Sequence, residues 1–172
     1  AAVELGRERL AREIERYTWM QAHPTTTQGM PPSIEREKGE LSIMPPDLRC
    51  PQGEADCFAW YQKHKTAIES TIRANQALIW RLDAAANAEQ FSNPWPHYLY
   101  SSLPPYSRLT SSHELWLAMA ALEWQDGQQA KAVAKVAQAS VLRTKLAEGS
   151  NSLITSMVAL AMQYRELRWL SN

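Results

Sequence analysis

The chain has 172 residues, a hydrophobic share of 45%, and 18 basic side chains against 18 acidic ones. That length is enough for one domain with a substantial core, and the neutral balance lacks the basic surface that nucleic-acid binding needs. No apolar run reaches the roughly 18 residues that suggest a membrane span. Seven tryptophans suit either helix packing or a recognition surface.

Residues 3–22 predict the first helix, because Leu10, Ile14 and Tyr17 recur at helical spacing among many charges that favour a solvated face. His23-Pro24 ends this helix, since the residue before a proline avoids the helical region. Residues 23–56 hold six of the ten prolines and three of the six glycines, which predicts a long loop with a short extended piece at 41–44. Loops of this length in compact domains are functional, mobile or tied down.

Cys50 and Cys57 are the only two cysteines, and they enclose a short Pro-Gln-Gly turn. One lies in the loop and the other at the start of the next predicted helix, so we predict a disulfide that ties down the end of the loop. Such a bond places the protein in an oxidising compartment. A zinc site made by both cysteines and a histidine is the alternative.

Residues 56–86 predict the second helix, with Asp56 as its cap and an apolar stripe of Ile68, Ile72, Ile79 and Leu82. Asn75 falls within this stripe, either as a satisfied core group that fixes the packing or as a ligand contact.

Residues 87–107 combine four prolines, which exclude a continuous helix, with five aromatic residues, which exclude a disordered linker. We expect an ordered aromatic loop that is either a lid on the core or the rim of a binding groove. Its candidate binding residues are Trp95, Tyr98, Tyr100 and Tyr106.

Three further helices follow. The third begins at the cap Ser112 and ends at Asp126-Gly127, the alanine-rich fourth covers 128–148, and the fifth follows Gly149-Ser150-Asn151-Ser152. The fifth helix has a 4-3-4-3 apolar spacing that predicts the seam of an antiparallel three-helix bundle, namely Leu153, Met157, Leu160, Tyr164 and Leu167.

Residues 113–146 resemble in part a tetratricopeptide repeat, whose aromatic and small positions fall on Trp116, Ala120, Ala132 and Ala139. The usual leucine-glycine pair, second aromatic and closing proline are absent, and repeat folds need about three units. A single helical hairpin is the alternative.

No catalytic motif is visible in the chain. There is no Gly-x-Ser-x-Gly elbow and no phosphate-binding glycine loop, and His113-Glu114 lacks the second histidine of a zinc protease because residue 117 is leucine. The histidines are scattered, and we expect each to be a surface or cap residue: His23, His64, His97 and His113. We predict no metal and no cofactor.

The segments Pro104-Pro105-Tyr106, Asp126-Gly127 and 149–154, with the close cysteine pair and residues 75–81, resemble a family of uncharacterised proteobacterial envelope proteins. This resemblance implies an N-terminal membrane anchor, a periplasmic helical body and no particular activity. The chain does not begin with Met, and it stops soon after the apolar Trp169-Leu170. We therefore expect a fragment of a longer chain, with the anchor outside it.

The sequence thus predicts one all-α domain over residues 1–172, with about five helices. Residues 1–57 form the first helix and the disulfide-clipped, proline-rich loop, and residues 58–172 form the helical bundle. The function we expect is a non-enzymatic module that binds a protein partner on the periplasmic side of the cell envelope. Alternatives are an immunity protein that neutralises a secreted toxin, a hydrolase or lipid-active enzyme around His97 and the Glu114–Glu123 helix, and a structural subunit.

Overall fold

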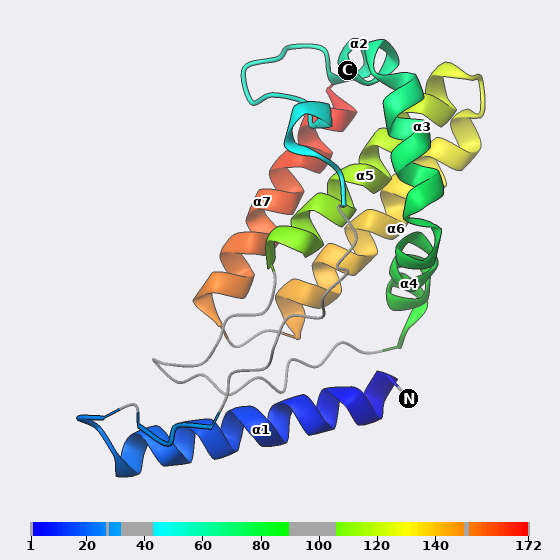
Figure 1. Cartoon of the computed structure of the whole chain (residues 1–172). Coiled ribbons are helices and arrows are strands. Elements are labelled where there is room, and N and C mark those ends of the chain that lie inside the picture. The colour runs from blue at the N-terminus through cyan, green and yellow to red at the C-terminus, as the bar shows by residue number, and fades with distance from the viewer. Residues whose placement is uncertain (1, 27, 32–42, 90–105, 150–151, 172) are drawn as a thin grey trace. The chain divides into compact units, whose positions relative to one another are not determined.

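The structure is a computed structural model of the chain (Figure 1) and describes residues 2–26, 28–31, 43–89, 106–149 and 152–171. Every regular element in these ranges is helical, with seven α-helices and one short 3-10 helix. The all-α prediction is therefore confirmed, while the predicted count of five was too low. The predicted binding residues Trp95, Tyr98 and Tyr100 lie outside the described residues, as do residues 41 and 42 of the predicted extended piece. Its other two residues, 43 and 44, are described and form no strand.

The chain divides into two compact units, Ala1–Glu40 with Asn93–Pro104, and Leu41–Ser92 with Pro105–Asn172. The described part of the first unit is α1 (Ala2–Ala22), close to the predicted 3–22, and the turn that follows it. Trp19 stacks on His23 with ring centroids 4.4 Å apart, and His23 Nδ1 lies 3.0 Å from the Trp19 carbonyl oxygen. These contacts lie at the C-terminal end of α1, which ends at Ala22, next to the predicted stop at His23-Pro24.

The predicted helix over 56–86 is broken into α2 (Cys57–Lys63), α3 (Lys65–Ala74) and α4 (Gln76–Asn87). Asp56 caps α2 as predicted, because its Oδ1 accepts a hydrogen bond from the Ala59 amide at 2.9 Å. The two breaks fall at His64 and Asn75, whose side chains bond to carbonyl groups four residues earlier and compete with the regular helix. The sequence pattern missed both breaks because the apolar period continues across them.

Three long helices pack against one another in the second unit: α5 (Tyr106–Gln125), α6 (Gln129–Glu148) and α7 (Leu153–Leu170) (Figure 1). Ala132 and Ala139 on α6 are fully buried, so small side chains do permit close approach on that helix. The predicted start of α5 at Ser112 was wrong by about two turns. Ser112 lies inside the helix, where its hydroxyl donates to the Arg108 carbonyl at 2.8 Å and needs no capping role.

Cys50 and Cys57 form the predicted disulfide, with their Cα atoms 5.5 Å apart. Both thiols are consumed by this bond, so the alternative zinc site is wrong. The 3-10 helix η1 (Pro46–Leu48) precedes the disulfide, and Met44 and Leu48 are buried in the same core cluster as Cys50 and Cys57. The described end of the loop is therefore part of the core and not a free connection.

Among the described residues, no helix combines the length and the apolar character that crossing a membrane requires.

We predict that reducing the disulfide lowers the free energy of unfolding by about 2–3 kcal/mol, because the bond closes a loop of only a few residues. Urea unfolding, followed by tryptophan fluorescence with and without reductant, measures this difference. The double variant Cys50→Ala/Cys57→Ala is the control, and its stability should not respond to reductant. Equal stabilities for the oxidised and the reduced wild-type protein would contradict the prediction.

Candidate functional site

Helix α7 has two faces with the same 4-3-4-3 spacing, and the structure buries the one that the sequence analysis did not choose. The buried residues are Thr155, Ala159, Met162, Glu166 and Trp169. The residues predicted as the bundle seam are exposed to solvent. That part of the prediction was wrong, although the helix itself and its place beside α5 and α6 are as expected.

Glu166 is the centre of the buried face of α7. Its side chain is about 5% exposed, and its two oxygens accept hydrogen bonds from His113 Nε2 at 2.9 Å, Ser140 Oγ at 2.8 Å and Arg143 Nε at 3.0 Å. His113 comes from α5, and the other two partners come from α6. One carboxylate therefore joins all three long helices, and a buried charge with three donors is satisfied.

The protonation states of this cluster follow from its burial. Burial alone would raise the pKa of Glu166, but the hydrogen bonds from His113, Ser140 and Arg143 outweigh it and hold the pKa below its ordinary value. Burial lowers the pKa of His113, against the attraction of Glu166. His113 is 0% exposed, and its buried Nδ1 has no hydrogen-bond partner among the described residues. A neutral imidazole that donates from Nε2 to an ionised Glu166 fits these facts.

The outer face of α7 is apolar over the whole helix. We call it the apolar face, and its side chains are between 41% and 78% exposed: Leu153, Ile154, Met157, Leu160, Tyr164, Leu167 and Leu170. Single exposed apolar residues are ordinary on protein surfaces, but a continuous row of them is typical of an interaction site.

A second feature lies at the C-terminal half of α7, where a pocket of about 130 Å³ meets the disulfide. We call it the arginine pocket because three guanidinium groups line it. Arg49 precedes the disulfide, and Arg165 and Arg168 lie one turn apart on α7. The complete lining is Arg49, Cys50, Gln52, Cys57, Tyr61, Glu114, Leu117, Tyr164, Arg165, Arg168 and Trp169.

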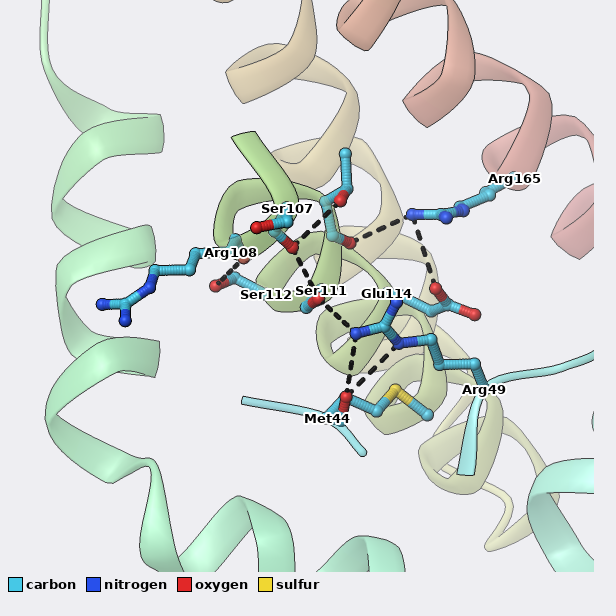
Figure 2. Close-up of polar contacts among 9 residues, drawn as sticks. Met44, Arg49, Ser107, Arg108, Ser111, Ser112, Glu114 and Arg165 are labelled. Atoms are coloured by element: carbon cyan, nitrogen blue, oxygen red, sulfur yellow. Dashed lines mark hydrogen bonds and ion pairs between the residues drawn. The ribbon is translucent and has the colours of Figure 1, made fainter. Parts of the chain in front are cut away.

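Each arginine is held in place by neutral oxygen atoms. Arg49 donates to the Met44 carbonyl at 3.2 and 3.3 Å and to Ser111 Oγ at 2.6 Å (Figure 2). Arg168 Nη2 donates to the carbonyls of Pro51 and Glu54, at 3.0 and 2.6 Å. These bonds attach the disulfide loop to α5 and α7, and the acceptor in each of them is a neutral oxygen atom.

Arg165 forms an ion pair with a buried acid. Its Nη1 donates to the Thr110 carbonyl at 3.2 Å and lies 3.4 Å from Glu114 Oε2. Figure 2 marks the contact between Arg165 and Glu114. This ion pair lacks hydrogen-bond geometry, so the buried Oε2 has no hydrogen-bond partner among the described residues. Glu114 is 4% exposed, and its burial raises its pKa, while the charges of Arg165, Arg49 and Arg168 act in the opposite direction.

Tyr61 closes the inner side of the pocket. It is 3% exposed, and burial raises its pKa, with a further contribution from the charge of Glu114. Its phenol is therefore neutral at any physiological pH, and the charges of the pocket are those of the three arginines and Glu114.

The residues that the sequence analysis selected as candidates lie in different parts of the structure and do not form one site. Tyr106 begins α5, and its hydroxyl hydrogen-bonds to the Thr155 hydroxyl on α7. The binding role of Tyr106 and of the aromatic loop stays a prediction. His64 ends α2 as the expected cap residue, whereas His113 is buried and the expectation of a surface or cap role for it was wrong. His97 lies outside the described residues.

The arginine pocket itself was missed. Arg49 lies more than a hundred positions before Arg165 and Arg168 in the chain, so no local motif contains all three arginines. One signal was available in the sequence, namely the charged run Arg165-Glu166-x-Arg168 on a helix that is otherwise apolar. Charged side chains that are buried in such a helix need polar partners, so this run indicates a polar site.

Comparison of the chain with protein-family models, with curated proteins and with solved structures found no match in any of the three. The proposals below therefore depend on the geometry of the described residues.

We predict that the protein loses stability as the pH falls from 7.5 to 5. The unfolded chain takes up a proton at His113 near pH 6.5, while the folded protein resists it, so unfolding is favoured by up to about 1.4 kcal/mol per pH unit. The raised pKa of Glu114 acts with the opposite sign, because its folded form takes up a proton first as the pH falls.

Urea unfolding at several pH values tests this with two variants. His113→Gln keeps a donor for Glu166 but cannot titrate, so its stability should depend less on pH than that of the wild type. Glu114→Gln removes the opposing contribution and should make the acid loss steeper. A pH slope that is unchanged in His113→Gln would contradict the assignment.

Proposed function

We propose that this chain is a non-enzymatic protein-binding module, and that it binds a partner helix along the apolar face of α7. The observation that carries the proposal is the exposure of a complete 4-3-4-3 row on a helix whose other face already packs in the bundle. Such a row is the half of a coiled-coil seam that accepts knobs from a second helix.

The details of the row favour a helix as the occupant. Leu153, Leu160 and Leu167 recur every seven residues, with Met157 and Tyr164 between them. An α-helix of 18 residues is about 27 Å long, which offers a partner four to five turns of contact. An extended strand would meet these side chains only at irregular intervals, because its own period is two residues.

The residues beside the exposed row indicate what kind of contact surface a partner helix would need. Ser156, Ala161 and Gln163 are uncharged, and Arg168 is engaged with the carbonyls of the disulfide loop. The face therefore offers no strong charge pattern, and it fits an amphipathic helix with an apolar, uncharged contact surface. Nothing in these flanks repels a second copy of the chain, so self-association is an outcome that the test must separate.

The free energies of side-chain burial and of association indicate that a stable complex must cover most of the apolar face. Fully burying one leucine side chain contributes about 1.5–3 kcal/mol, and these residues are already partly buried in the free protein. Association costs on the order of 4–15 kcal/mol in lost freedom of motion. A partner that covers only one or two leucines therefore binds weakly, and a stable complex needs a helix along most of α7.

The disulfide supports a setting in an oxidising compartment, and we propose the periplasmic side of a bacterial envelope. The proposal keeps the tetratricopeptide-like reading of the α5–α6 hairpin as the scaffold that presents α7. If the partner is a secreted toxin, the module is an immunity protein; if it is a neighbouring envelope component, the role is assembly. The enzyme alternative is a hydrolase or lipid-active protein with a site around the Glu114–Glu123 helix and His97, of which His97 lies outside the described residues.

The first test places a photo-crosslinking amino acid at position 160 and, as a control, at position 80, where Trp80 is 70% exposed on α4. In cells that make the protein, we expect an adduct from position 160 and none from position 80. An adduct of twice the chain's mass identifies a second copy, and any other mass identifies a different partner for purification.

Direct binding of the purified partner is then measured by calorimetry with Leu160→Glu and the matched control Trp80→Glu. We expect Leu160→Glu to abolish binding and Trp80→Glu to preserve it. Both replaced side chains are mostly exposed, so unfolding free energies should change by less than about 1 kcal/mol. The proposal fails if position 160 gives no adduct, or if Leu160→Glu binds as tightly as the wild type.

A further inference from the structure

We propose that the helix bound by the apolar face is α7 of a second copy of this chain, so that two copies form an antiparallel dimer with twofold symmetry. This inference rests on the proposed function, because it uses the same face and names its occupant. Four observations support it: the spacing of the exposed row, the distribution of charge along α7, the neutral balance of the chain and the exposed area.

The exposed row is self-complementary when two copies of α7 run in opposite directions. Leu160 of one copy can lie opposite Tyr164 of the other. A step of three residues along both helices then places Met157 opposite Leu167. In a twofold-symmetric pair each of these contacts occurs twice, which gives four layers of apolar side chains. The symmetry axis passes at the level of position 162, close to the middle of α7, so the two helices overlap along almost their whole length.

The charges on α7 favour the antiparallel orientation over the parallel one. Residues 153–164 contain no charged side chain, whereas Arg165, Glu166 and Arg168 follow directly after them. In an antiparallel pair, the charged end of each helix lies beside the uncharged half of the other. A parallel pair would bring the two charged ends, with two arginines each, close together, and like charges across an interface are unfavourable. The antiparallel pair also places the positive N-terminal end of each helix dipole beside a negative C-terminal end.

The chain as a whole does not oppose pairing with itself. Its 18 basic and 18 acidic side chains balance, and proteins with a net charge near zero associate more readily than strongly charged ones. Interfaces between identical subunits are also more apolar than other interfaces, and their centres are poor in charged residues. The apolar face has this composition, and it lacks the charge pattern by which a different, charged partner would be selected.

The exposed area is sufficient for a dimer. The side chains of the apolar face are between 41% and 78% exposed, and a large apolar side chain offers on the order of 150 Å² when it is fully exposed. At a mean exposure of about 60%, the seven side chains provide roughly 600 Å² per copy and roughly 1,200 Å² for two copies. Stable interfaces bury about 1,200–2,000 Å² in total, so this area lies at the lower limit. We therefore expect a dimer that dissociates on dilution and whose contact extends along all of α7.

Sedimentation equilibrium of the purified chain over a dilution series measures this self-association. We expect a species of twice the chain's mass. Leu160→Glu should raise the dissociation constant at least about a hundredfold, because a symmetric interface would bury two unpaired carboxylates. Trp80→Glu makes a matched change at an exposed residue of α4 and should leave the dissociation constant unchanged. Far-UV circular dichroism of both variants should match the wild type, since both replaced side chains are mostly exposed.

Introduced cysteines test the antiparallel pairing. Both native cysteines are joined in the disulfide, so a new cysteine is the only free thiol in its variant. After mild oxidation, an equilibrated mixture of Leu160→Cys and Tyr164→Cys should give a covalent dimer that contains one chain of each kind, and should give more of it than either variant alone. Trp80→Cys measures the background from random collisions. In a parallel pair position 160 would lie opposite itself, so a covalent dimer from Leu160→Cys alone would overturn the antiparallel arrangement.

A second copy is excluded as the occupant if the chain stays a monomer at every concentration, or if Leu160→Glu and Trp80→Glu dimerise equally well. If a monomeric chain still gives an adduct of another mass from position 160 in cells, a different protein occupies the face. In that case the helix-binding proposal stands and only the present inference fails. If neither a dimer nor any adduct forms, both proposals fail.

Discussion

The carboxylate of Glu166 is the constraint on which the rest of the bundle depends. It receives one donor from α5 and two from α6, so the rotation of α7 about its own axis is fixed by hydrogen bonds as well as by packing. Breaking a buried, paired charge is strongly unfavourable. A rotation of α7 that turned the leucines inward would expose Glu166 and leave His113 and Arg143 without their acceptor, and that loss opposes the gain from burying apolar surface.

Both candidate sites are consequences of this rotation. With Glu166 turned inward, Leu160, Tyr164 and Leu167 face solvent. Arg165 and Arg168, on either side of Glu166 in the sequence, reach α5 and the disulfide loop. The disulfide completes the arrangement, because it holds the segment that carries Arg49 beside α2. One buried ion cluster and one covalent bond thus position the apolar face and the arginine pocket on the same helix.

The sequence was sufficient for the all-α class, the disulfide, the cap at Asp56 and the extent of α1, α6 and α7, since these depend on local patterns and on only two cysteines. It was insufficient for the orientation of α7. Two 4-3-4-3 series are present on that helix, and hydrophobicity favours the leucine series. The partners that make the other series the buried one, His113, Ser140 and Arg143, lie on different helices, and no periodicity within α7 refers to them. The breaks at His64 and Asn75 were missed for a related reason, because side-chain hydrogen bonds to the backbone leave the apolar period intact.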